Sequence, residues 1–192
     1  MSPTDTNLAI AILAFVTLQR LGELVLAQRN TAALLARGAY EVAPGHYPLI
    51  VAVHAGWLAA LWWLAPGQPV AWIWLAIFML LQLGRVWVIA TLGSRWTTRI
   101  IVLPGAPLVT GGPFRFVSHP NYLVVAGELI ALPLAFGLVE VAVVFTVLNA
   151  LVLAIRIRAE NAALSEATSR VGDVSASNAS SPQPAGHTDA GR

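Results

Sequence analysis

The sequence predicts an all-α integral membrane protein with about five transmembrane helices. Of its 192 residues, 57% are hydrophobic and only 10% are charged, and the mean hydropathy is +0.73. A soluble domain carries roughly 25% charged residues, so this composition excludes that class. A bilayer core of about 30 Å requires roughly 20 apolar residues of helix, and the chain contains several apolar runs of that size.

Five apolar segments follow one another, at about residues 8–27, 47–64, 70–92, 122–136 and 138–157. The second and third are separated only by the turn 65–69, so they are expected to form a helical hairpin. The last two meet almost without a linker at Gly137, and they are expected to dip or tilt if they do not both cross the membrane. Pro133 is expected to kink or end the fourth helix, because proline removes a backbone donor and clashes with the preceding turn.

The positions of the arginines predict the orientation. The first and third connections and the C-terminal side carry Arg29, Arg37, Arg95, Arg99, Arg115, Arg156, Arg158 and Arg170. The two other connections contain no Arg or Lys, and basic loops stay on the cytoplasmic side. Five crossings then place the N-terminus outside and the C-terminus in the cytoplasm. The first span lacks a basic leader and a convincing cleavage site, so we expect it to be retained.

Composition also divides the chain and excludes several classes of function. Residues 1–170 form the predicted membrane domain, whereas residues 171–192 are too poor in apolar side chains to order themselves and are predicted to be a disordered tail. No internal repeat is evident, which weighs against a transporter built from duplicated halves. The absence of cysteine excludes disulfides and thiolate chemistry. A net charge of +2 on so few charged residues does not predict a nucleic-acid partner.

Ionisable side chains inside the spans are candidates for function, because burying a charge in a membrane is unfavourable. Arg20 and Glu23 lie three apart, so they either pair with each other or line a site. Gln82 and Arg85 are also three residues apart. The side chain of Arg85 either snorkels to the interface or has a functional role inside the bundle. Glu128 has no basic neighbour in sequence, so it must find a partner on another helix, remain protonated or hold a ligand.

A polar island at residues 111–122 is the chief candidate site, since it is too polar for a span and too compact for a generic linker. His119 and Tyr122 lie there, at the same cytoplasmic rim at which Arg156 and Glu160 leave the last span. Arg156 and Glu160 either form an i,i+4 pair or face His119 and Tyr122 across the rim. Such a pocket suits a nucleoside with an amino-acid tail, because aromatic faces attract a sulfonium cation and arginine can bind a carboxylate.

Two further observations concern the aromatic residues and the histidines. Most of the 7 tryptophans are expected to form interfacial belts. Trp96 lies in a polar loop and either joins such a belt, which we favour, or forms the wall of a cofactor cavity. No second histidine or acidic cluster accompanies His119 at the spacing of metal ligands, so no metal site is predicted.

Together these motifs resemble the signature of the isoprenylcysteine carboxyl methyltransferase family, integral membrane enzymes that use S-adenosylmethionine. The resemblance rests on residues 108–114 and 119–122, on Glu128 and Pro133, and on residues 156–160. Residues 19–23 and 45–48 resemble those of the small bacterial members of the family, which implies a bacterial inner membrane. It implies that Arg156 faces the acceptor and that the cofactor is bound by Leu108, Val109, Phe114, His119, Pro120, Asn121, Tyr122 and Glu160. The chain departs from the eukaryotic members at Ala106, Pro107 and Phe114, and from the second glutamate of many members at Asn161.

The resemblance implies an S-adenosylmethionine-dependent O-methyltransferase whose lipophilic acceptor enters from the membrane. The acceptor is open between an isoprenylcysteine-like carboxylate and an alkyl phenol or pyrone. A carboxylate needs positioning, by Arg156, and dehydration. A phenol or enol must also lose a proton, and His119 is then the first candidate base. The alternative is a non-catalytic transporter or assembly subunit, in which Arg20, Glu23, Arg85 and Glu128 form structural pairs.

The arginine distribution predicts opposite compartments for the two ends of the membrane domain. A reporter fused after Arg170 is expected in the cytoplasm, and one fused before Leu8 outside, because an odd number of crossings separates them. Paired fusions to alkaline phosphatase, which is active only outside, and to a fluorescent protein, which reports the cytoplasm, measure both positions. The same compartment for both ends would contradict five crossings.

Overall fold

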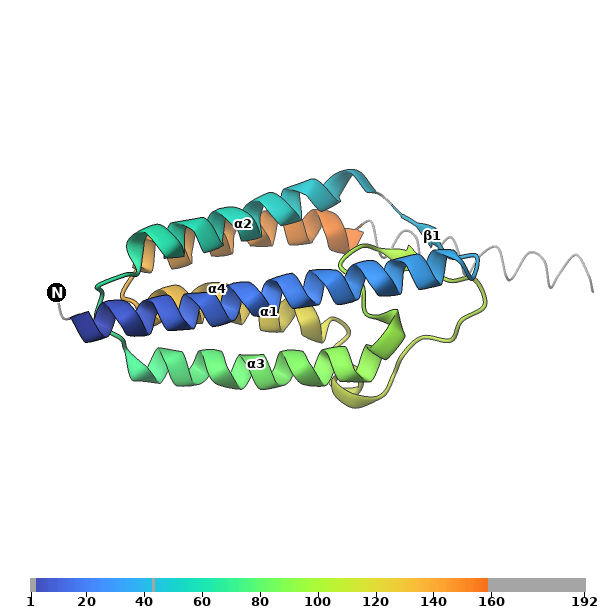
Figure 1. Ribbon diagram of the computed structural model, residues 1–192. Coiled ribbons are helices and arrows are strands. Elements are labelled where there is room, and N and C mark those ends of the chain that lie inside the picture. The colour runs from blue at the N-terminus through green and yellow to red at the C-terminus, as the bar shows by residue number, and fades with distance from the viewer. Residues whose placement is uncertain (1–2, 43, 159–192) are drawn as a thin grey trace, which may run out of the picture.

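The chain folds as a bundle of long helices that run roughly parallel or antiparallel to one another (Figure 1). The computed structural model describes residues 3–42 and 44–158. Its helices are α1 (Pro3–Leu35), α2 (Tyr47–Leu64), α3 (Trp72–Leu92), α4 (Pro120–Ala135) and a last helix, Val139–Arg158. All except the shorter α4 are long and apolar enough to cross a membrane. The predicted all-α membrane fold is therefore confirmed within the described residues.

Helix α1 extends well beyond the predicted span of residues 8–27. Its 33 residues, at about 1.5 Å each, make a helix of about 50 Å, which exceeds a bilayer core of about 30 Å. The helix continues through Gly22 and ends at Leu35, and Gly38 follows that end with a positive φ of 87°. In the added turns Asn30 donates to the backbone carbonyls of Gly93 and Trp96, at 3.1 and 2.8 Å, and so holds the loop after α3.

Helix α4 ends where proline predicts. Pro133 lies inside its last turn, and the helix stops at Ala135. The carbonyl of Pro133 then accepts hydrogen bonds from the backbone of Phe136 and Leu138, and Gly137 adopts a positive φ of 69°. With 16 residues α4 is only about 24 Å long, so it reaches less than the full depth of a bilayer core. This hairpin is as tight as the sequence predicts.

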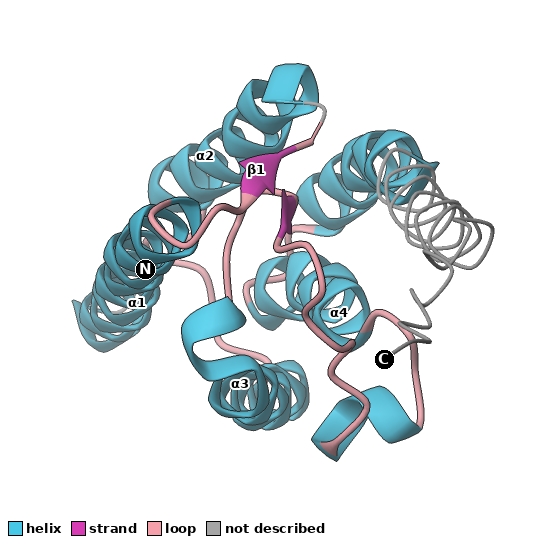
Figure 2. Ribbon diagram, turned by 90° about the vertical axis from the view of Figure 1, so that its right-hand side faces the viewer, coloured by secondary structure: helices cyan, strands magenta, loops and turns pink. Residues whose placement is uncertain are grey.

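Most of the non-helical chain collects at one end of the bundle, which Figure 2 views end-on. Strand β1 (Tyr40–Glu41) pairs antiparallel with β2 (Ile101–Val102), and the short helices are η1 (Pro44–His46), η2 (Gly93–Arg95) and η3 (Gly112–Arg115). Arg99 donates to Glu41 at 2.8 Å beside the strands. We call this the arginine-rich end, because the basic connections meet there. Strands of two residues are too short to leave a pattern in the sequence.

The hydrophobic core occupies the opposite half of the bundle. Its buried members come from every long helix and include Leu13, Val16, Trp57, Leu61, Phe78, Leu129, Leu132, Phe136 and Val141. Each lies in the half of its helix that is remote from the arginine-rich end, apart from Phe136 in the turn that closes the far end. Of the buried charged side chains, Arg85 lies in the other half of its helix, and Glu128 lies next to the core residue Leu129.

Two adjacent glycines before α4 give a matched test of backbone strain. Gly112 has a φ of +56°, and a Cβ placed on it would lie 2.5 Å from Oγ1 of Thr91, whereas Gly111 has no atom within 4 Å of its Cβ position. Gly112→Ala is expected to destabilise the protein by about 1–2 kcal/mol, the cost of left-handed backbone for an L-residue. Gly111→Ala should cost much less. Apparent melting temperatures in one detergent measure both variants, and equal shifts would contradict the strain.

Candidate functional site

A hydrogen-bonded cluster of charged side chains joins α1, α3 and α4 inside the bundle. Glu128 accepts two bonds from Arg85, from Nε to Oε1 at 2.9 Å and from Nη2 to Oε2 at 2.6 Å. Arg20 adds a bond to Oε2 at 2.7 Å, and Gln82 one to Oε1 at 2.7 Å. Glu23 accepts from both arginines, at 3.0 and 2.9 Å. Two guanidinium and two carboxylate groups therefore balance one another.

The cluster decides between the alternatives that the sequence left open. Arg20 and Glu23 do pair, and both also line a cavity, so the two interpretations hold together. Of the two alternatives for Arg85, the structure favours a position inside the bundle over snorkelling, because its side chain is buried and bonded to Glu128 and Glu23. Glu128, which has no basic neighbour in sequence, finds its partners on two other helices.

Above this cluster lies a cavity of about 330 Å³ that extends toward the arginine-rich end. Its walls come from α1, α2, the loop after α3, the start of α4 and the last helix. Above the cluster, the polar side chains that line the cavity are Tyr47, His54, Thr97, Thr98, Asn121, Tyr122, Asn149 and Arg156. Leu21 on α1 and Val51 on α2 also line it and are 54% and 43% exposed, so its apolar wall reaches the lipid-facing surface.

Three residues that the sequence assigned to the rim meet at the end of this cavity. Nε of Arg156 donates to the hydroxyl of Tyr122 at 2.9 Å, and its Nη1 donates to the carbonyl of Thr98 at 2.7 Å. The ring of Tyr122 stacks on that of His119, with centroids 5.0 Å apart and planes inclined by 14°. His119 is the N-cap of α4, and Pro120 in the first turn supplies the backbone angle with which a helix begins.

The other predicted cofactor residues are less closely gathered. Asn121 lines the cavity, and its buried Oδ1 has no hydrogen-bond partner within the described chain. Leu108 and Val109 lie in the loop before η3, where Leu108 is exposed and Val109 is half-buried. Phe114 lies in η3, and Pro120, at the start of α4, is buried. His119, Leu108, Val109, Phe114 and Pro120 are not part of the cavity lining. Glu160 lies outside the described residues, as does the predicted tail 171–192.

Trp96 and three further residues correct or extend the sequence analysis. Trp96 is 3% exposed and lines the cavity, so the belt that we favoured for it is wrong. The hydrogen bond from Asn30 to its carbonyl folds this loop inward. The sequence analysis missed Tyr47, His54 and Asn149. Tyr47 and His54 are seven residues apart on α2, a spacing that places them on one helical face and could have shown them together.

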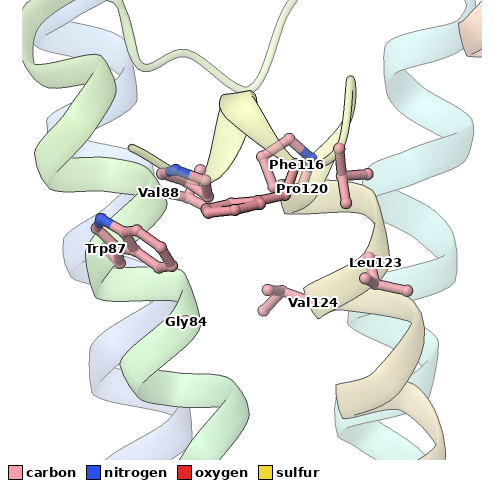
Figure 3. Close-up of a pocket in the computed structure, with 9 residues that line it drawn as sticks. Gly84, Trp87, Val88, Phe116, Pro120, Leu123 and Val124 are labelled. Atoms are coloured by element: carbon pink, nitrogen blue, oxygen red, sulfur yellow. The ribbon is translucent and has the colours of Figure 1, made fainter. Parts of the chain in front are cut away.

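A second, smaller pocket of about 220 Å³ lies between α3, η3 and α4 (Figure 3). Its labelled walls include Trp87, Val88, Phe116 and Val124, and no ionisable side chain lines it. Phe116 and Leu123 are 76% and 64% exposed. The pocket is an apolar groove on the outer surface without groups for catalysis. Nor does any group of three or more His, Asp or Glu side chains suited to a metal ion occur among residues 3–42 and 44–158.

Comparison with known proteins assigns the family. The profile of the isoprenylcysteine carboxyl methyltransferase family matches residues 74–166. The uncharacterized protein YpbQ of Bacillus subtilis (strain 168) is 36% identical over 161 residues, which cover 81% of this chain and 95% of that protein. The chain belongs to the isoprenylcysteine carboxyl methyltransferase family.

An uncharacterized protein of Haemophilus influenzae is 31% identical over 143 residues, which cover 71% of the chain and 83% of that protein. No solved structure gives a significant match. As a member of the isoprenylcysteine carboxyl methyltransferase family, the protein is placed among methyltransferases of membrane-embedded substrates. The profile spans α3, α4 and the last helix, and so includes Asn121, Tyr122 and Arg156.

The buried cluster predicts a large difference between two glutamates. Glu128→Ala leaves Arg85 without its main partner in the interior, and removing one member of a buried pair typically costs about 3–5 kcal/mol. Glu41→Ala breaks the pair with Arg99, whose side chain is 41% exposed, and exposed pairs are worth about 0–1 kcal/mol. Thermal unfolding in the same detergent measures both losses. A Glu128 variant as stable as the Glu41 variant would show that the cluster does not hold the helices together.

Proposed function

We propose that the protein is an S-adenosylmethionine-dependent O-methyltransferase that acts on a lipophilic acceptor reaching the site from the membrane. The observation that carries this proposal is the cavity. It joins Asn121, Tyr122 and Arg156 at the arginine-rich end to an interior whose apolar wall continues to the lipid-facing surface at Leu21 and Val51. A water-soluble methyl donor and a lipophilic acceptor can therefore meet inside it.

The residues at the arginine-rich end fit a nucleoside with an amino-acid tail. The unpaired Oδ1 of Asn121 is buried, and a buried acceptor of this kind calls for a donor such as an amine or a ribose hydroxyl. Trp96 lines the same cavity, and its aromatic ring favours a cation such as a sulfonium. We propose that Leu108, Val109, Phe114, His119, Pro120 and Glu160 complete the binding site. S-adenosylmethionine, when bound, supplies a methyl group that is electrophilic because it is attached to a sulfonium.

Arg156 is suited to hold the acceptor. Its Nε and Nη1 are fixed by Tyr122 and Thr98, and Nη2 makes no hydrogen bond within the described chain. A guanidinium held in this way offers a charged donor to an acceptor oxygen at little further entropic cost. This arrangement serves an isoprenylcysteine-like carboxylate as well as the anion of an alkyl phenol or pyrone. We favour the phenol or enol class, as the resemblance to small bacterial members suggests.

The proposed orientation in the membrane also fits the source of the methyl donor. S-adenosylmethionine is a cytosolic metabolite, and we propose from the positive-inside rule that the arginine-rich end faces the cytoplasm. With the N-terminus outside, in a bacterial inner membrane, Tyr122 and Arg156 would face the cytosolic donor. We propose that residues 1–170 form this catalytic domain.

The rival function is a non-catalytic transporter or assembly subunit in which the buried ion cluster is structural. The cluster does have a structural role, since it links three helices. It does not explain the cavity above it, the unpaired Asn121 or the match to a methyltransferase family. A rival of this kind would not bind S-adenosylmethionine.

Calorimetric titration of S-adenosylmethionine into detergent-purified protein tests the proposal. The wild type is expected to bind, and Glu160→Ala to bind about tenfold or more weakly, since a charge-assisted hydrogen bond is worth about 1.5–3 kcal/mol. Glu140→Ala is the matched control, because Glu140 is an exposed residue at the far end of the last helix. No binding by the wild type would reject the function, whereas equal affinity of the two variants would remove only Glu160 from the site.

A further inference from the structure

The interior of the cavity contains a histidine that the cofactor site does not use. We propose that His54 accepts the proton of a phenolic or enolic acceptor bound in this cavity. This inference rests on the proposed methyl transfer and deepens it, since it assigns the acceptor to the hydroxyl class that must be deprotonated. A carboxylate is already ionised near neutral pH and has no use for such a base.

The hydrogen bonding of His54 leaves its proton-accepting nitrogen available. Nδ1 lies 2.8 Å from the carbonyl oxygen of Ile50, one turn earlier on α2. Because a carbonyl only accepts, Nδ1 must carry the proton, and Nε2 of the neutral ring then carries a lone pair. His54 lines the cavity, and Nε2 has no hydrogen-bond partner in the part of the chain that the structure describes. The backbone thus sets the tautomer that a base requires.

His54 is better placed for this step than His119. The ring of His119 stacks on Tyr122, and His119 does not line the cavity. A hydroxyl held inside the cavity therefore meets the imidazole of His54 rather than that of His119. The expectation that His119 is the first candidate base is replaced on this ground, and His119 remains a proposed cofactor contact.

Both positive and negative side chains surround His54. The ionisable groups that face it across the cavity, or from the cluster below it, are Arg20, Glu23, Tyr47, Arg85, Tyr122, Glu128 and Arg156. Arg20 and Arg85 are paired with Glu23 and Glu128, so that cluster is neutral as a whole. Arg156 is the cation without a carboxylate partner among the described residues, and it can stabilise the oxyanion that forms when the proton leaves.

The chemical step balances without a further reagent. The acceptor hydroxyl gives its proton to Nε2 of His54, and the resulting oxyanion forms a bond to the methyl carbon. The C–S bond of the donor breaks, and its electron pair stays on sulfur, which becomes a neutral thioether. His54 returns its proton to water after the product leaves. An imidazole that acts in this way typically contributes about 10²–10⁴ in rate.

Two acceptors that differ in acidity test the proposal in detergent-purified enzyme. An alkylated phenol must lose its proton on the enzyme, whereas an alkylated dinitrophenol is already an anion at neutral pH. His54→Asn keeps a donor for the Ile50 carbonyl but has no basic nitrogen. We expect it to lower methylation of the phenol about 10²-fold more than methylation of the dinitrophenol. Val51→Ala, a cavity-lining change on the same helix that removes no proton acceptor, should lower both rates by one common factor.

A spectroscopic readout is independent of turnover. An alkylated mononitrophenol is bound to the protein without S-adenosylmethionine, and the absorbance of its phenolate is followed against pH. In the wild type ionisation is expected at a pH lower by about one unit or more than in His54→Asn, a tenfold change in the ionisation ratio. His54→Gln provides a second variant should the asparagine variant not fold.

The outcomes separate this inference from the proposed function. Failure of the wild type to bind S-adenosylmethionine and to methylate either acceptor would reject the function. Methylation of both acceptors with no selective loss in the His54 variants, or with that loss in His119→Gln instead, would overturn the role of His54. The wild type gives a further test: as the pH falls and the imidazole of His54 becomes protonated, methylation of the phenol should fall more than methylation of the dinitrophenol. A profile as flat as that of the dinitrophenol would exclude a histidine base.

Discussion

The ion pair between Glu128 and Arg85 is the interaction on which the rest of the structure depends. A charge among membrane helices is tolerated only when it is neutralised and its hydrogen bonds are satisfied. Glu128 meets this requirement with two bonds from Arg85, one from Arg20 and one from Gln82. These bonds fix the depth of α1, α3 and α4 relative to one another, because sliding any of them by one residue would break them.

The cluster separates a half of the bundle that is packed with apolar side chains from a half that contains the cavity. On one side of the cluster the helices pack through apolar side chains such as Leu61, Phe78 and Leu132. On the other side they diverge around the cavity, where polar side chains can remain only partly satisfied, as Asn121 does. The cluster of Arg20, Glu23, Arg85 and Glu128 below the cavity is neutral as a whole. It therefore neither attracts nor repels the cationic methyl donor that we propose. The cluster thus supports the site without belonging to its chemistry.

The helices could be predicted from the sequence, but much of the site could not. Apolar runs and Pro133 gave the ends of α2, α3 and α4 to within about two residues, because membrane helices are determined by local composition. The inward position of Arg85, the burial of Trp96 and the two-residue strands depend on partners far away in the chain, which local patterns do not contain. His54 was missed for a related reason. A single histidine in an apolar run becomes a candidate for function only when the packing of the other helices shows that it lines a cavity.

Two of the basic side chains that line the cavity, Arg156 and His54, are suited to different tasks. The bonds of Arg156 to Tyr122 and Thr98 hold the plane of its guanidinium, so this side chain suits the binding of an anion. The carbonyl of Ile50 orients the ring of His54 and leaves Nε2 as the proton acceptor, so this side chain suits proton transfer. An acceptor between them would lose a proton on one side and find its negative charge balanced on the other. Because both groups are held by the backbone of the helices and the loop after α3, neither needs to rearrange when the acceptor arrives.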